Sequence, residues 1–167
     1  PKNLKFYYYA PPKWLTFWKK GGRGIRTYYY LWMIGAALFI KNKNINFDII
    51  HHVTFVSIRI PSFLCLYNVP FIFGPLSGGD TVPTNLRKNF TLKEKIKEFL
   101  RDLNNFYIRF SPLVNLNFFK AHKIYVNSEN TKSIIPKIYH HKVDILLAVG
   151  YESNENLKIN KILNKPF

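Results

Sequence analysis

Hydrophobic residues occur along this chain in short runs, separated by longer stretches in which they recur at helical spacing. Each short run has the length and the β-branched or aromatic content of a strand. The run at residues 70–74 is continuously apolar, which is typical of a strand in a parallel sheet that is covered on both faces. The predicted strands are residues 4–9, 48–52, 70–74, 123–127 and 143–147.

The stretches between these runs predict helices. Residues 91–110 show the clearest pattern, because Leu92, Ile96, Phe99 and Leu103 recur at three- and four-residue intervals among charged residues. Thr91 is followed three residues later by Glu94, the spacing of a capping box, so we expect this surface helix to begin there. The other predicted helices are residues 25–43, 56–67, 112–120 and 129–139.

Apolar strands that alternate with helices indicate βαβ units. We therefore predict an α/β fold with a Rossmann-like parallel sheet and helices on both faces. A chain of 167 residues is about one domain long, so we expect residues 1–167 to form a single domain.

The charge is strongly positive. Lysine and arginine number 25 against nine acidic residues, and no acidic residue precedes Asp48. Such an imbalance suits an anionic partner, such as nucleic acid, acidic lipid headgroups or a phosphorylated substrate. The abundance of Lys, Asn, Ile and Tyr also fits an AT-rich coding sequence, which would raise the charge without any function.

Two classes of site are disfavoured. Cys65 is the only cysteine, so the chain can form no internal disulfide and no thiolate metal cluster, and we expect Cys65 to be a small core residue. His51 and His52 are adjacent on a predicted strand and point to opposite faces, so they cannot converge on a metal. We expect no metal and no cofactor.

Polar and glycine residues follow three of the predicted strands. In open parallel sheets ligands bind beyond the carboxyl ends of the strands, so these residues are the candidates for a binding site. His51, His52 and Thr54 lie at and after the end of the strand predicted at 48–52. Gly78, Gly79 and Asp80 follow the strand at 70–74, and Ser128 and Glu129 follow the strand at 123–127.

Each candidate also has a purely structural interpretation. One histidine could face the binding site beyond the strand ends as a hydrogen-bonding group or base, while the other would be a core residue. Gly78 and Gly79 could let backbone amides approach a ligand, or simply form a turn. Ser128 could face a ligand at a helix N-terminus, or only cap that helix.

Together these segments resemble a known family. Residues 47–55 (FDIIHHVTF), 70–80 (PFIFGPLSGGD) and 121–131 (AHKIYVNSENT) are similar in order and spacing to the N-terminal domain of the family 4 glycosyltransferases. The resemblance covers residues 47–150 well and the aromatic stretch before them more loosely.

The resemblance implies one half of a GT-B enzyme, in which two Rossmann-like domains face each other across a cleft. Such enzymes transfer a sugar from a nucleotide-sugar donor to an acceptor with retention of configuration and without a required metal. The N-terminal domain binds mainly the acceptor, here a glycan or lipid-linked molecule. On this basis we expect the family's first strand and glycine-rich loop before Leu4, the donor domain after Phe167, and no catalysis by residues 1–167 alone.

Two other functions compete with this one. A basic module that binds nucleic acid would need aromatic side chains interleaved with lysines on one surface, and only the composition supports it. Peripheral attachment to an anionic membrane is compatible with sugar transfer, because the basic segment 13–26 carries Trp14 and Trp18. We expect a cytoplasmic protein that can attach to the inner face of the membrane and has no nucleic acid partner.

Overall fold

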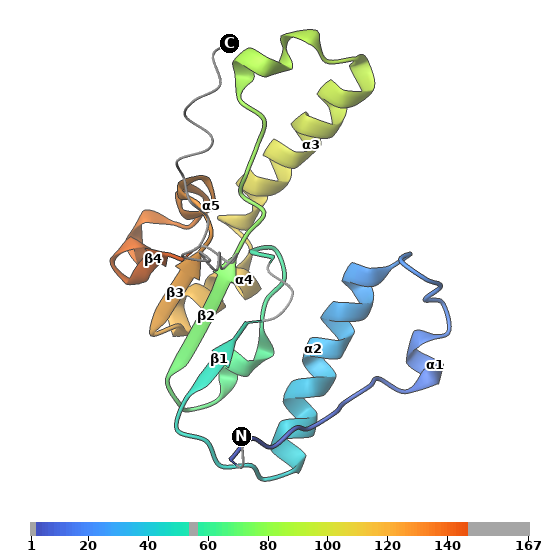
Figure 1. Ribbon diagram of the computed structural model, residues 1–167, viewed down its shortest axis with the longest axis vertical. Coiled ribbons are helices and arrows are strands. Elements are labelled where there is room, and N and C mark those ends of the chain that lie inside the picture. Colours follow the sequence, from blue (N-terminus) through green and yellow to red (C-terminus); the bar gives the residue numbers. More distant parts are fainter. Residues whose placement is uncertain (1–2, 54–56, 147–167) are drawn as a thin grey trace, which may run out of the picture.

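A computed structural model describes residues 3–53 and 57–146. Its centre is a four-stranded sheet in the order β1-β2-β3-β4, and every neighbouring pair of strands is parallel. Helices flank the sheet (Figure 1). The predicted α/β class, with a Rossmann-like parallel sheet, is confirmed. The strands are β1 Ile50–His52, β2 Phe71–Leu76, β3 Lys123–Val126 and β4 Val143–Ile145.

One face of the sheet forms the main core. Side chains alternate along the strands, so Phe71 and Phe73 are buried whereas Ile72 between them is only partly covered. Ile124 and Val126 extend the same buried face across β3. Phe118, from a flanking helix, is fully buried in the same apolar cluster. The other face carries His51, Tyr125 and Asp144, which keep more contact with solvent.

β2 contains an irregularity that fixes its path. The register with β3 shifts between Phe73 and Leu76, and the Gly74–Pro75 peptide bond is cis. Gly74 has a φ of 122°, and a Cβ there would lie 2.2 Å from the carbonyl oxygen of Tyr125. Only glycine therefore fits at this point.

Most predicted helices are present. The predicted capping box at Thr91 and Glu94 is confirmed, with both reciprocal contacts formed. The α-helices are α1 Lys13–Thr16, α2 Ile25–Asn42, α3 Leu92–Ile108, α4 Pro112–Lys120 and α5 Glu129–Ile134, and the 3-10 helices are η1 Phe63–Leu66, η2 Thr84–Asn89 and η3 Lys137–Lys142.

Two predicted helices were too long. In place of a helix over 56–67, the described part of that segment forms only η1, which Ser62 caps by accepting a hydrogen bond from the Leu64 amide. The helix predicted over 129–139 ends at Ile134, because Pro136 cannot continue it and η3 follows instead.

The strand predicted at residues 4–9 is wrong. This segment runs beside α2 without pairing with a strand, and Tyr9 packs on that helix while Phe6 and Tyr8 are exposed. The Tyr9 carbonyl accepts a hydrogen bond from Trp32 Nε1 at 3.0 Å, and the Tyr9 ring contacts Trp32 and Phe39. Gly35 permits this approach, since a Cβ there would lie 2.0 Å from the Tyr9 hydroxyl.

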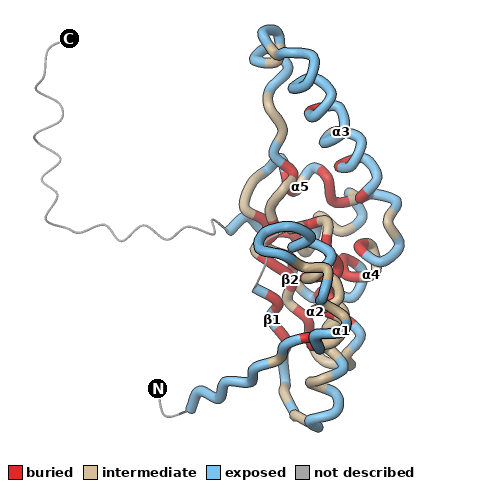
Figure 2. The backbone as a smooth tube through the Cα atoms, turned by 90° about the vertical axis from the view of Figure 1, so that its right-hand side faces the viewer, coloured by how far each residue is buried: buried red, intermediate tan, exposed pale blue. Residues whose placement is uncertain are grey.

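α3 extends away from the sheet (Figure 1). Most of its length is exposed, and buried positions occur on one side only (Figure 2). Among the residues that the structure describes, no helix is both long and apolar enough to cross a bilayer.

Candidate functional site

The two adjacent histidines of β1 have different environments, as their alternation on a strand requires. His52 is buried, its Nε2 lies 3.0 Å from the Tyr29 hydroxyl of α2, and its ring meets the edge of Phe73. His51 is exposed on the opposite side. His52 therefore has the surroundings of a core residue, while His51 is accessible to a ligand.

His51 is held in a defined orientation. Its Nε2 lies 2.9 Å from the carbonyl oxygen of Gly74, and its ring is 6.5 Å from that of Tyr125. A carbonyl oxygen can only accept a hydrogen bond, so Nε2 is the donor and carries the hydrogen. In the neutral ring Nδ1 then has the lone pair and can accept a proton or a hydrogen bond.

The loop after β2 and the segment after β3 are in direct contact. The Ser128 hydroxyl donates to Asp80 Oδ1 at 2.8 Å and also caps α5 by accepting from the Thr131 amide at 3.2 Å. The Gly79 amide donates to Thr131 Oγ1 at 3.3 Å. The structure therefore brings Gly79, Asp80 and Ser128 together at the carboxyl ends of β2 and β3.

Glycine is required in this loop for steric reasons. A Cβ on Gly79 would lie 2.4 Å from the Thr131 Cα, so any side chain would push the loop away from α5. Gly78 has a φ of 102°, which other residues rarely adopt. The Gly78-Gly79 pair thus lets the loop lie directly against the N-terminal turn of α5.

Arg59 is a site residue that the sequence analysis missed. Its Nη2 donates to the Gly78 carbonyl at 2.7 Å and also to Asn105 Oδ1 of α3. Burial lowers the pKa of the Arg59 guanidinium, and the charges of Arg26 and Arg101 lower it further. A basic residue inside the apolar run 56–60 was the available signal in the sequence.

The remaining candidates are placed as follows. Glu129 is the exposed first residue of α5, where a negative charge suits the helix dipole. His51 contacts Gly74 in the body of β2, whereas Asp80 and Ser128 meet beyond the end of that strand. Thr54 lies outside the described residues.

The exposed side chains of Asp80 and His51 suit a ligand rich in hydroxyl groups. Asp80 is exposed, and a carboxylate can accept further hydrogen bonds beside the one from Ser128. His51 offers a ring nitrogen as acceptor or base. Within residues 3–53 and 57–146, no three His, Cys, Asp or Glu side chains group as a metal site would need. The expectation of metal-independent chemistry stays a prediction.

Comparison of the chain with models of protein families, with curated proteins and with solved structures gives no match.

Proposed function

We propose that this chain is the acceptor-side half of a retaining glycosyltransferase that takes its sugar from a nucleotide-sugar donor. The observation that carries the proposal is the junction of Asp80 and Ser128, which joins the ends of β2 and β3 beside the Gly78-Gly79 turn. The residues of this junction belong to the segments whose sequence resembles the family 4 enzymes. Their position at the carboxyl edge of a parallel sheet is where such folds bind ligands.

His51 is the residue to which we assign the acceptor hydroxyl. With Nε2 fixed by the Gly74 carbonyl, Nδ1 can accept the hydrogen bond of a sugar hydroxyl and orient its oxygen. Asp80 would accept from a second hydroxyl of the same glycan or lipid-linked acceptor. His52 supports β1 from the core side and takes no part in the reaction.

Arg59 strengthens the proposal for a charged substrate. Its half-buried guanidinium borders the Gly78 carbonyl, so it adds positive potential where a phosphate of the donor or acceptor would lie. The reaction itself requires the donor-binding half of a GT-B enzyme.

The direct test is sugar transfer by a protein that joins this chain to such a donor half. A panel of uridine and guanosine diphosphate sugars is incubated with glycan and lipid-linked acceptors, and the anomeric configuration of the product is determined by NMR. A product with retained configuration supports the proposal. A product with inverted configuration, or no transfer with any donor, contradicts it.

We further propose that the opening segment, residues 13–26, contacts an anionic membrane surface. Trp14 and Phe17 are 74% and 79% exposed, and they stand beside Lys13, Lys19 and Lys20. Exposed aromatics next to lysines suit the interface of an acidic bilayer. This would place the acceptor site near lipid-linked substrates at the inner face of the membrane.

A further inference from the structure

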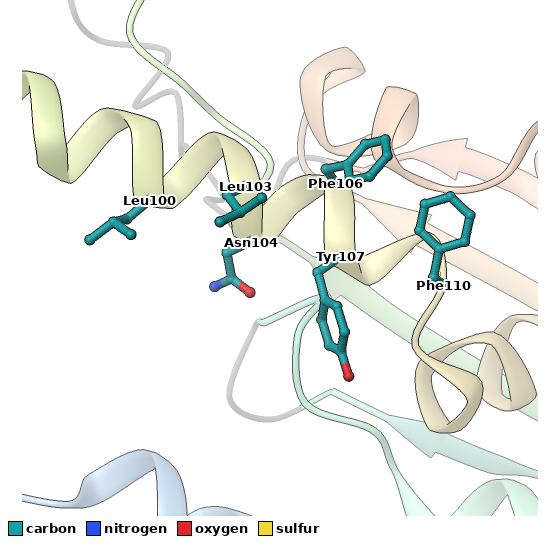
Figure 3. Close-up of a pocket in the computed structure, with 6 residues that line it drawn as sticks. All are labelled: Leu100, Leu103, Asn104, Phe106, Tyr107 and Phe110. Atoms are coloured by element: carbon teal, nitrogen blue, oxygen red, sulfur yellow. The ribbon is translucent and has the colours of Figure 1, made fainter.

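Helix α3 turns its apolar side outward. Leu100, Leu103, Phe106 and Tyr107 project from the helix, and Phe110 follows in the turn after it (Figure 3). We call the apolar residues of this side the α3 stripe, and each is between 51% and 75% exposed. The stripe consists of Leu92, Ile96, Phe99, Leu100, Leu103, Phe106, Tyr107 and Phe110.

The stripe is continuous along the helix. At 3.6 residues per turn its helical members fall within an arc of about 120°. The helix has 17 residues, so the stripe is about 25 Å long. A contiguous exposed apolar surface of this size marks an interaction site rather than scattered surface residues.

The opposite side of α3 attaches the helix to the rest of the protein. Glu98 is buried and its carboxylate lies 3.8 Å from Arg87 of η2, whereas its 3.1 Å contact with Arg101 stays within α3. Asn105 is also buried and accepts a hydrogen bond from Arg59. Because these polar contacts and buried Ile108 hold the inner side, the stripe cannot rotate into the core without breaking them.

The charges beside the stripe are positive. Lys93 and Lys95 flank it on its two sides, and both are exposed, as is Lys97. Of the acidic residues of α3, Glu98 is buried and Glu94 lies on the side opposite the stripe, while Asp102 borders the stripe beside Lys95 but is paired with Arg87. An apolar stripe of Phe and Leu bordered by lysines is the pattern of a helix that lies in the plane of a membrane interface.

We propose that α3 binds an anionic lipid surface, with the α3 stripe among the acyl chains and Lys93 and Lys95 at the headgroups. A second copy of this chain is the less favourable occupant. Pairing two stripes would bring the flanking lysines of both copies together, and each copy already carries a formal net charge of +16. An acidic lipid surface neutralises this charge instead. The inference does not depend on sugar transfer.

A probe on the stripe tests the proposal locally. Cys65 is buried, and burial raises the pKa of its thiol, so a new surface cysteine can be labelled selectively. We would label Leu103→Cys with a polarity-sensitive fluorophore, and Ile138→Cys as the control, since Ile138 is 73% exposed on η3. With phosphatidylglycerol vesicles the Leu103→Cys probe should shift to the blue and the control should not. An unshifted Leu103→Cys probe on vesicles that bind the protein overturns the proposal.

Sedimentation with vesicles gives the second measurement. Phe99→Ser combined with Leu103→Ser should weaken binding to anionic vesicles at least about tenfold, because two large apolar groups leave the interface. Phe119→Ser, at an exposed phenylalanine of α4, should leave binding unchanged. Equal binding by the stripe variant overturns the proposal. So does a wild-type dimer that this variant converts to monomer without any change in vesicle binding, since the stripe would then be a protein interface.

Discussion

The Tyr29 hydroxyl and His52 Nε2 form a hydrogen bond of 3.0 Å that joins α2 to β1. The preceding residue, His51, lies on the other side of the strand and contacts the carbonyl of Gly74. His52 therefore contributes to stability, while the exposed His51 is left for the ligand binding that we propose. The difference between their contributions to stability can be measured.

Tyr29→Phe should lower the free energy of unfolding by about 1 kcal/mol, since it removes one hydrogen bond and keeps the ring stacked on Trp32. His52→Ala should lower it by about 2–4 kcal/mol, because it also leaves a cavity beside Phe73. His51→Ala removes one hydrogen bond at an exposed position and should cost about 1 kcal/mol. Urea denaturation followed by circular dichroism gives all three values. A His51→Ala cost equal to that of His52→Ala would be inconsistent with this difference.

Gly79→Ala should destabilise the protein by about 1–3 kcal/mol, because the new methyl group meets the backbone of Thr131. Gly22→Ala is the matched control, since a Cβ there has no atom within 4 Å. Thermal melts of the two variants provide the comparison. If both melt alike, the loop does not lie against α5 as described.

The capping box of α3 should respond to acid. Two hydrogen bonds from Thr91 lower the pKa of Glu94 in the folded chain. The one from the backbone amide has the larger effect, and the one from the hydroxyl adds to it. A carboxylate with a lowered pKa in the folded state stabilises the fold at pH values above its unfolded pKa of about 4.3. This contribution is lost as the pH falls through the folded pKa. The stability difference between wild type and Glu94→Gln should therefore shrink below about pH 4.3. A difference that stays constant to strongly acidic pH argues against the prediction.

Membrane binding by the opening segment can be tested separately. Trp14→Ser combined with Phe17→Ser should weaken binding to anionic vesicles, since two exposed aromatics leave the interface. Leu86→Ser is the control, because Leu86 is also exposed but lies outside this segment. Binding should also weaken at high salt, where lysines attract acidic headgroups less strongly. Binding that is unchanged in the double variant removes the segment from the interface.

Much of the fold could be predicted from the sequence. The runs that contain β1 to β4 are short, rich in β-branched and aromatic residues and separated by helical patterns, which depends little on distant residues. The strand prediction for residues 4–9 failed because aromatic content gives strand propensity but does not reveal whether a partner strand exists. Here Tyr9 packs on Trp32 instead.

The site could be predicted only in part. The positions of Gly79, Asp80 and Ser128 follow from the rule that the ends of parallel strands meet at one edge. Which histidine faces outward depends on where α2 packs against β1, and the sequence of β1 does not show this. The role of Arg59 depends on contacts with Gly78 and Asn105, 19 and 46 residues away in the sequence. The outward direction of the α3 stripe likewise depends on where Glu98 and Asn105 are buried, since helical periodicity shows a stripe but not its partner.

The central claim is that His51 acts on the acceptor in a sugar transfer, and the most direct measurement is the turnover of His51→Ala in the protein that carries a donor half. We predict a loss of at least about a hundredfold with the fold intact by circular dichroism, in the range for a positioned acid or base. Tyr29→Phe, which alters only the core side of β1, should keep most of its activity. Near-normal turnover by a folded His51→Ala variant would contradict the account.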